Sequence, residues 1–495
     1  MARDFNALKY LDKLTVVFYL LLVVFGCMNI YSASITTDQA SIFDISCRSG
    51  MQILWVSISI VVAIVVLFFD DNFFSQFAFL LYGAMILILI ATIFLSHDIN
   101  GSRSWLSFGA FSIQPAEFSK FVTALAVAGY VGRQEFMLHK FRDYLFVIAL
   151  ILLPMLVIIL QKETGTALVF ASFILLLYRE GMSGLVPLLA FLAVLLFVVT
   201  VKFSGDIFLD IDGVQAGLCY ALIIIFIVQI VFLIHFRRDT FNALILTGAL
   251  IFFLLVSLLV NLFLVYVNIV YVLLAINIAS AIYLLVLSFL RWRRAYWLIA
   301  LFVFLSTSYA FSSGYIFSSI LQPHQQKRIK VVLGMIDDPK GVGYNTRQAA
   351  IAIGSGRVFG KGYLNGTQTR LKYVPEQHTD FIFCTVGEEW GFLGSFFLIS
   401  VYTLLMWRIK VMAERAESHF VRAYAYGVLG IFAFHFIVNI GMVIGVMPVI
   451  GIPLPFISYG GSSFLGFTFM LAVLLKLDTK REERLKGKLD TFVSI

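Results

Sequence analysis

Residues 75–95 read SQFAFLLYGAMILILIATIFL, a run of 21 residues without a charged side chain. About 20 apolar residues in an α-helix cross the hydrocarbon core of a membrane, which is roughly 30 Å thick. The rest of the chain has the same character, since 61% of its 495 residues are hydrophobic types and 13% are charged. Soluble domains have about 45–50% apolar and about 25% charged residues. The composition therefore excludes a soluble enzyme and a disordered chain, and it predicts a polytopic membrane protein.

Fourteen apolar runs of this kind occur along the chain and predict an all-α polytopic fold. They are 14–33, 51–69, 75–95, 115–132, 143–160, 165–179, 184–202, 215–236, 240–260, 265–289, 296–315, 380–407, 420–444 and 460–477. The two runs between 240 and 289 are the least distinct, because only Asn261 to Asn268 separates them.

Basic residues predict the orientation, because cytoplasmic loops are rich in Lys and Arg. The clusters are Arg133–Arg142, Arg237–Arg238, Arg291–Arg294, Arg408–Arg415 and Lys476–Lys488. With fourteen spans all of them fall on one side, so we expect both termini in the cytoplasm and the loop around Asp206 and Asp210 outside. These loops explain the net charge of +8, and we expect no nucleic-acid partner.

Residues 316–379 form a large polar loop that this orientation places outside. Between Gln322 and Asp380 the loop has nine basic and four acidic residues. Long loops are exempt from the charge rule, and a basic surface for an anionic headgroup is the alternative explanation. Glycine permits close backbone approach and exposed amide donors for an anion, which favours the second explanation. The glycines concerned are Gly354, Gly356, Gly360, Gly362 and Gly366.

Seven motifs follow one another along the chain. They are Gly101–Leu106 (GSRSWL), Gln114–Lys120 (QPAEFSK), Lys162–Ala167 (KETGTA), His324–Ile329 (HQQKRI), Gly360–Arg370 (GKGYLNGTQTR), Pro375–Phe383 (PEQHTDFIF) and Gly445–Ser463 (GVMPVIGIPLPFISYGGSS). In this order they resemble the SEDS family (shape, elongation, division and sporulation), and Asn365–Thr369 resembles its RodA branch. The resemblance covers nearly the whole chain except roughly 200–290.

The resemblance implies a single membrane domain over 1–495, a bundle of ten family helices with about four more inserted at 200–290. An even number of inserted helices keeps 316–379 outside. It also implies a peptidoglycan glycosyltransferase that polymerises lipid II at the outer face of the bacterial cytoplasmic membrane during elongation and shape maintenance. The implied partners are a class B penicillin-binding transpeptidase and other membrane proteins of the elongation complex. A lipid II flippase, a division-type paralogue and a scaffold are the alternatives.

Asp380 is the candidate general base for the acceptor hydroxyl. It ends the polar loop, begins the run 380–407 and matches the position of the family's presumed catalytic Asp. We expect the helix N-terminus, Arg370 and Lys372 to keep it ionised. The alternative is a helix N-cap, which Asp also favours. His378 is a candidate to assist, and Arg370 is also a candidate substrate contact.

Cations are needed for the diphosphate leaving group. Arg328 and Lys327 are candidates, with Arg103 from an earlier outer loop, and Gln325 belongs to the same motif as the first two. The alternative role for these side chains is anchoring at the membrane interface.

Three further charged residues are candidate substrate-binding groups. Glu117 and Lys120 lie three residues apart in an apolar helix, and we expect them to pair and line a polar cavity, because an intramembrane charge is costly. Glu117 also fits a helix start. Where the family has Asp, Glu163 places its carboxylate one methylene further out.

The sequence has no His/Cys cluster with metal-ligand spacing and no cofactor motif. A divalent cation, Mg or Mn, that bridges the diphosphate and carboxylates remains a hypothesis from the chemistry alone.

Overall fold

The computed structural model describes residues 11–34, 42–70, 72–96, 102–108, 111–133, 136, 140–211, 214–263, 267–336, 338, 341 and 343–493. Its contacts divide the chain into a main unit, Met1–Ser183 with Pro339–Ile495, and a second unit, Gly184–Asp338. The second unit is wider than the insertion over 200–290 that the sequence suggested. That the chain is one membrane domain stays a prediction.

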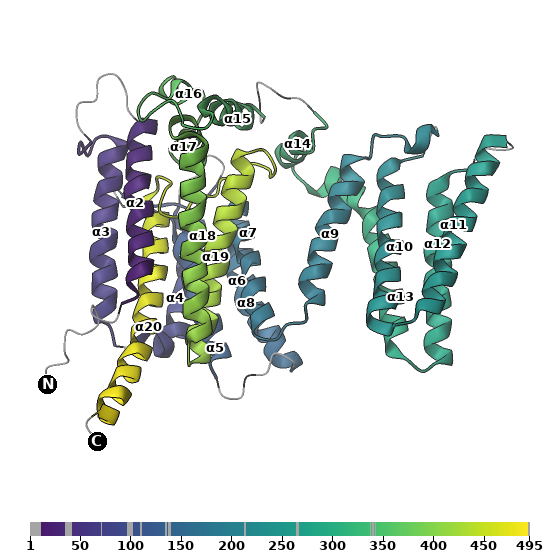
Figure 1. Ribbon diagram of the computed structural model, residues 1–495, viewed down its shortest axis with the longest axis horizontal. Helices are drawn as coiled ribbons and strands as arrows, with labels where there is room; N and C mark the ends of the chain where they lie inside the picture. The colour runs from purple at the N-terminus through teal and green to yellow at the C-terminus, as the bar shows by residue number, and fades with distance from the viewer. Residues whose placement is uncertain are drawn as a thin grey trace. The chain divides into compact units, whose positions relative to one another are not determined.

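The main unit is a helical bundle with a short hairpin (Figure 1). Its helices are α2 (Lys13–Ser34), α3 (Arg48–Phe68), α4 (Phe73–Leu95), α5 (Pro115–Val131), α6 (Phe141–Leu160), α7 (Thr164–Val169), η1 (Phe170–Phe173), α8 (Ile174–Arg179), α15 (Tyr344–Gly356), α16 (Thr367–Arg370), α17 (Ile382–Glu389), α18 (Gly391–Arg415), α19 (His419–Val443) and α20 (Gly461–Val493). Strands β1 (Leu106–Phe108) and β2 (Phe111–Ile113) are antiparallel, with Leu106 opposite Ile113. Short helices α15, α16 and α17 lie at one end of the bundle, and α20 ends at the other.

The second unit is also helical. Its elements are α9 (Leu185–Lys202), η2 (Phe208–Asp210), α10 (Ala216–Arg237), α11 (Thr240–Phe263), α12 (Ile269–Leu290), α13 (Arg294–Tyr315), the π-helix η3 (Ile316–Ile320) and α14 (Pro323–Val332). Phe226, Leu233 and Tyr296 are among the side chains of its buried core.

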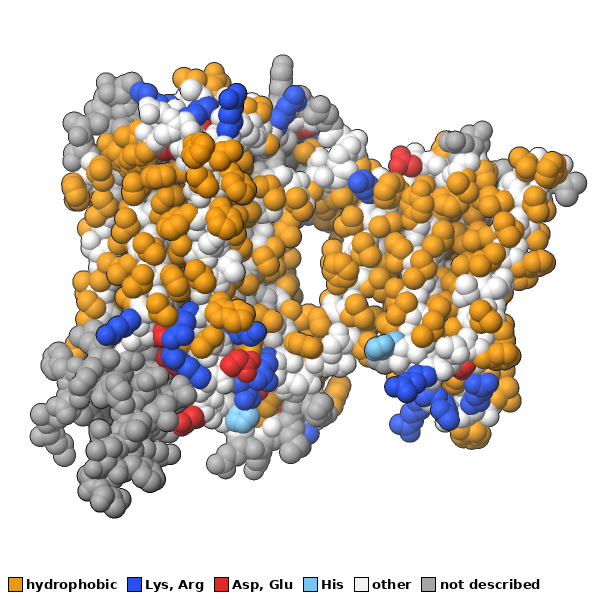
Figure 2. Space-filling model, viewed as in Figure 1, with side chains coloured by type: hydrophobic (Ala, Val, Ile, Leu, Met, Phe, Trp, Pro, Cys, Tyr) orange, Lys and Arg blue, Asp and Glu red, His pale blue; other side chains and the backbone are white. Residues whose placement is uncertain are grey.

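All fourteen predicted runs are helical, which confirms the all-α polytopic fold. Twelve helices in the described residues are long and apolar enough to cross a membrane. The other two runs form shorter helices, α5 with 17 residues and the segment Thr164–Arg179. Hydrophobic side chains cover the middle of each unit, and Lys and Arg gather near the ends (Figure 2).

The run 380–407 is two helices, α17 and α18, rather than one. The chain turns at Trp390–Gly391, where Gly391 has φ +64°. A Cβ at Gly391 would lie 2.3 Å from the backbone nitrogen of Gly360, so only glycine fits this contact. The break makes α17 a short helix at the end of the bundle.

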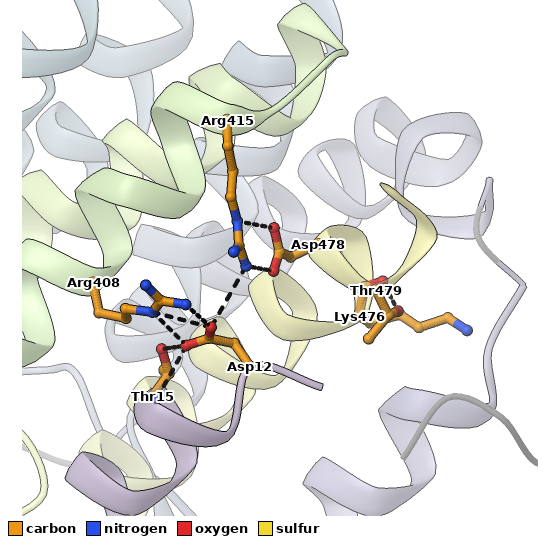
Figure 3. A network of polar contacts seen from close by, with 7 residues as sticks. All are labelled: Asp12, Thr15, Arg408, Arg415, Lys476, Asp478 and Thr479. Carbon is orange, nitrogen blue, oxygen red and sulfur yellow. Dashed lines mark hydrogen bonds and ion pairs between the residues drawn. The ribbon is translucent and has the colours of Figure 1, made fainter. Parts of the chain in front are cut away.

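Ion pairs connect the helices at the end predicted to be cytoplasmic (Figure 3). Arg408 Nε donates to Asp12 Oδ2 at 2.9 Å, and Arg415 Nε donates to Asp478 Oδ1 at 3.0 Å. Burial opposes ionisation of Asp12, but hydrogen bonds from Arg408 and Thr15 outweigh it and lower the pKa of Asp12 to about 2. The start of α2 is therefore joined to α18, and α18 to α20.

A second set of ion pairs joins α8 to α18 and α19. Arg179 donates to Glu414 at 2.8 Å, and Arg422 donates to Glu180 at 2.9 Å. Both arginines use two nitrogens for two carboxylate oxygens, the bidentate geometry that fixes orientation.

Candidate active site

Asp380 lies in the turn before α17 and does not begin a spanning helix. The N-cap position of α17 is Phe381, so the prediction that Asp380 begins a long helix is wrong, and so is the N-cap explanation. The physical reason is the break at Gly391, which separates the turn and α17 from the spanning helix α18. The side chain of Asp380 is partly buried.

Side chains from α19 and from the motif Gly445–Ser463 hold the backbone beside Asp380. Asn439 Nδ2 donates to the carbonyl of Asp380 at 2.8 Å and to that of Ile452 at 2.7 Å. Ser458 Oγ donates to the carbonyl of Thr379 at 2.6 Å. Asn439 has no exposed surface, so these bonds are shielded from water. These hydrogen bonds therefore hold the motif Pro375–Phe383 against the segment that follows α19.

Glycines bring the Asp380 carboxylate close to two other segments. Gly451 has φ +79°, and a Cβ there would lie 3.3 Å from Asp380 Oδ2. A Cβ at Gly165 would lie 2.7 Å from the carbonyl oxygen of Ile450. The start of α7 and the segment around Gly451 are thus packed together, which places Glu163 in the same region as Asp380.

The electrostatics of Asp380 differ from the prediction. Burial, with the carboxylates of Glu376 and Glu163, raises the pKa of Asp380 to about 6. Arg370 and Lys372, which the sequence suggested would keep this carboxyl ionised, are not among the groups that shift its pKa, because desolvation and two like charges dominate. A carboxyl with this pKa is still mainly ionised at neutral pH and is a stronger base than an ordinary aspartate.

His378 is held by a residue that sequence reasoning missed. Arg48 at the start of α3 places Nη1 2.9 Å from His378 Nδ1. Arginine only donates, so Nδ1 accepts and Nε2 carries the proton, 3.5 Å from Glu376 Oε2. Burial and the charge of Arg48 lower the pKa of His378 to about 4, so the ring is neutral at pH 7.

Glu163 holds the outer loop that contains Arg103. Its Oε1 accepts from Ser102 Oγ at 3.0 Å and from Ser104 Oγ at 2.7 Å. The backbone nitrogen of Arg103 donates to the carbonyl of Gln161 at 3.1 Å, and its side chain is exposed. The motif GSRSWL is therefore connected to KETGTA, with the Arg103 guanidinium facing solvent.

Glu117 and Lys120 pair as predicted, with Nζ and Oε2 2.7 Å apart. Lys120 also donates to His435 Nε2 at 3.1 Å, and His435 Nδ1 donates to the carbonyl of Pro453 at 2.9 Å. The sequence predicted that the pair lines a polar cavity. In the structure Lys120 has no exposed surface, so its ammonium is enclosed by protein. His435 was missed, since it lies 315 residues away and no local pattern marks it.

The glycine-rich loop surrounds a carboxylate of the protein itself, Glu388 on α17. Glu388 accepts from Lys361 Nζ at 2.7 Å, from the nitrogen of Gln368 at 2.8 Å and from the nitrogen of Thr369 at 2.8 Å. A Cβ at Gly356 would lie 2.0 Å from the carbonyl oxygen of Gly387. These glycines and this lysine thus pack against α17, which corrects the interpretation of the loop as a substrate-anion site.

The remaining candidates lie on short helices. Lys327 on α14 pairs with Asp338 at 2.8 Å, and the side chain of Gln325 caps α14 by accepting from the nitrogen of Gln322 at 3.1 Å. Arg328 also lies on α14, in the second unit. Arg370 is exposed at the end of α16 in the main unit. Their substrate-binding roles stay predictions.

No metal cluster is present in the described part of the chain, where three or more His, Cys, Asp or Glu side chains nowhere gather as a cation site requires. Asp380 nonetheless lies within electrostatic reach of Glu376 and Glu163. The divalent cation therefore stays a hypothesis.

A family model described as "Cell cycle protein", for FtsW, RodA and SpoVE, matches residues 12–210 and 267–483. The chain belongs to the FtsW/RodA/SpoVE family. The match confirms the SEDS resemblance and includes all seven motifs. It omits 211–266, which contains α10 and α11, whereas the sequence suggested about four inserted helices over 200–290. The limits of the insertion stay a prediction.

Relatives of this FtsW/RodA/SpoVE chain include the peptidoglycan glycosyltransferase RodA of Treponema pallidum. The two are 29% identical over 95% of this chain and 98% of the relative. The peptidoglycan glycosyltransferase MrdB of Escherichia coli K12 is 39% identical over 41% of this chain and 53% of its own length.

Solved structures share the fold. A chain from a study of polymerisation and crosslinking by a peptidoglycan synthase complex has TM-score 0.60 at 20% identity, over 95% of this chain and 98% of that chain. The rod shape determining protein RodA of Thermus thermophilus has TM-score 0.51 at 20% identity, over 95% and 97%.

Proposed function

We propose that the chain is a peptidoglycan glycosyltransferase that polymerises lipid II during cell elongation. Membership of the FtsW/RodA/SpoVE family and the names of the similar proteins support this function. The observation that carries it is the position of Asp380, a partly buried carboxyl with a pKa of about 6, where the motif Pro375–Phe383 packs against the motif Gly445–Ser463. The site lies at the end of the bundle predicted to be outside, so the reaction takes place at the outer face of the bacterial cytoplasmic membrane.

Asp380 acts as the general base. It takes the proton from the 4-hydroxyl of the acceptor GlcNAc as that oxygen attacks the anomeric carbon of the donor MurNAc. The new glycosidic C–O bond forms, the bond from the anomeric carbon to the phosphate oxygen breaks, and undecaprenyl diphosphate leaves with the electron pair. A base with a pKa near the working pH is efficient for this transfer. Asn439 and Ser458 hold its backbone in place, which keeps the carboxylate in position.

The leaving diphosphate requires positive charge. Arg103 is suited to this task, because its loop is held by Glu163 and its side chain is exposed. Arg328 and Lys327 of the second unit are further candidates. Mg or Mn at the carboxylates near Asp380 would supply the same charge, and a loss of activity on chelation that either ion restores would support it.

The chain acts with a class B penicillin-binding transpeptidase that crosslinks the new glycan. The similar fold in a study of a peptidoglycan synthase complex supports this partnership. Co-purification of the two membrane proteins at a fixed ratio would test it.

A flippase is the second candidate function, and the ion pairs opposite the site argue against it. A transporter opens alternately to both faces of the membrane. In this chain, paired arginines and carboxylates join α2, α18 and α20, and others join α8, α18 and α19. Bidentate pairs at several helix ends favour a bundle that stays closed there.

An assay of purified protein in vesicles with purified lipid II distinguishes a polymerase from a flippase and from a scaffold without activity of its own. A polymerase forms glycan strands without another enzyme, which gel electrophoresis detects after transpeptidase-free incubation. A flippase moves lipid II between the leaflets without forming polymer. A scaffold neither moves lipid II nor polymerises it. Absence of polymer from folded protein would refute the proposed function.

A further inference from the structure

A polar pocket of about 410 Å³ is lined in part by residues just before the candidate base in the chain, and the mechanism above does not use it. The end of α2, the start of α3 and the turn before α17 form its walls. The side chains that give the pocket its chemistry are Cys47, Arg48, Lys372, Glu376 and His378. All of them belong to the main unit.

The charge of this pocket is positive. Arg48 and Lys372 are cationic, Glu376 is the acidic residue that lines it, and the His378 ring is neutral. Nearby Asp44 accepts hydrogen bonds from its own neighbour Ser46, which also lines the pocket. Within the described residues, nothing forms an ion pair or a hydrogen bond with the Lys372 ammonium.

The position of Arg48 is electrostatically unfavourable for a cation. It is the first residue of α3, where the helix dipole disfavours positive charge. One nitrogen, Nη1, contacts His378 Nδ1 at 2.9 Å. The guanidinium has five N–H donors in a planar fork that fits carboxylate and phosphate oxygens. The exposed side chain therefore keeps donors for a ligand while His378 fixes its direction.

We propose that this pocket is a subsite that binds an anionic group of the substrate through Arg48 and Lys372. The group is a carboxylate of the stem peptide or a phosphate of the lipid diphosphate. The inference rests on the proposed function, which supplies such a substrate. Glu376 and His378 line the pocket, and Asp380 follows two residues later in the same turn. An anionic group bound in the pocket would therefore hold the attached sugar of the substrate near the base.

Cys47 gives a direct probe, because it lines the pocket and is partly buried. Its reaction with an anionic and with a cationic methanethiosulfonate reports the local potential. At a low ionic strength of about 0.01 M, a unit charge about 8 Å away changes the local concentration of a monovalent reagent roughly twofold in water. We expect the anionic reagent to react faster, and Lys372→Ala to lower the anionic-to-cationic rate ratio roughly fourfold, since both rates change.

Matched variants complete the measurement. Cys27, Cys219 and Cys384 are first changed to Ala so that Cys47 alone reacts. Arg357 is an exposed cation of the same outer loop that does not line the pocket, so Arg357→Ala should leave the ratio unchanged. Arg48→Ala should lower the ratio as Lys372→Ala does, and Arg48→Lys should restore it.

Protection of Cys47 identifies the ligand. The probes are inorganic pyrophosphate, a muramyl peptide with free carboxylates and the same peptide amidated. Protection by pyrophosphate alone assigns the pocket to phosphate, and protection by the free but not the amidated peptide assigns it to a carboxylate. A rate ratio that neither variant changes, with no protection by any probe, would overturn the proposal.

The polymerisation assay distinguishes a failure of the pocket proposal from a failure of the proposed function. Lys372→Ala should raise the KM for lipid II about tenfold with little change in kcat, as expected for a lost charge-assisted contact. An unchanged KM in an active enzyme would refute the pocket and leave the polymerase intact. A wild-type chain without polymerase activity would refute the proposed function, while Cys47 still reports whether anions bind.

Discussion

Replacement of Lys120 by methionine is expected to destabilise the main unit severely. The ammonium has no exposed surface and lies 2.7 Å from the Glu117 carboxylate and 3.1 Å from His435 Nε2. It also lies 5.0 Å from the centre of the Phe467 ring. Methionine fills much of the same volume but leaves a buried carboxylate without a counter-charge.

The magnitude follows from that uncompensated charge. Removal of one partner from a buried ion pair typically costs about 3–5 kcal/mol. The double variant Glu117→Gln with Lys120→Met leaves no unpaired charge, so it should be more stable than Lys120→Met alone. We expect a coupling free energy of at least about 2 kcal/mol in the double-mutant cycle.

Unfolding of the purified protein in mixed micelles, titrated with a denaturing detergent and followed by tryptophan fluorescence, measures these free energies. Lys13→Met is the matched control, because Lys13 is exposed at the start of α2. Coupling below about 1 kcal/mol would refute the reasoning. It would return Lys120 to the substrate cavity that the sequence suggested.

Three further predictions concern the site, the loop and the inserted helices. Polymerisation should rise with pH through about 6, because the base accepts a proton only when ionised and Asp380 has a pKa of about 6. Glu376→Gln should move this limb of the pH–rate profile to lower pH, whereas a flat profile between about pH 5 and pH 7 would contradict the assignment. Gly360→Ala should lower the melting temperature, because Gly360 has φ +78° and its Cβ would lie 2.0 Å from the carbonyl oxygen of Glu389. Gly354→Ala is the control with nothing within 4 Å, and equal melting of the two variants would refute the packing role. Excision of α10 and α11 should leave lipid II polymerisation intact, and loss of activity in an excised chain that folds and inserts would show that these helices matter.

The helices could be predicted from the sequence because apolar run length alone determines which segments can span. The break between α17 and α18 could not. Hydropathy continues across Gly391, and glycine is needed there because a Cβ would clash with Gly360, which lies 31 residues earlier. A tertiary contact of this kind leaves no periodic signal in the local sequence.

The site was predicted in part. Asp380 was found through the motif PEQHTDFIF, whereas Arg48, Asn439 and His435 each lie in or beside an apolar run without a motif partner. Each of these residues acts through a contact with a distant segment, and the local sequence does not show which segments come together. The glycine-rich loop was misinterpreted for a related reason, because a nest for an external anion and a nest for Glu388 have the same composition.

The most direct test of the account is the rate at which Asp380→Asn polymerises purified lipid II. Asparagine has nearly the same size, and the bond from Asn439 is to the backbone carbonyl, so the fold should be unchanged. A general base contributes about 10² to 10⁴ in rate. We predict normal unfolding and polymerisation at least about a hundredfold slower than wild type. Polymerisation by Asp380→Asn at near the wild-type rate would contradict the assignment of Asp380 as the base.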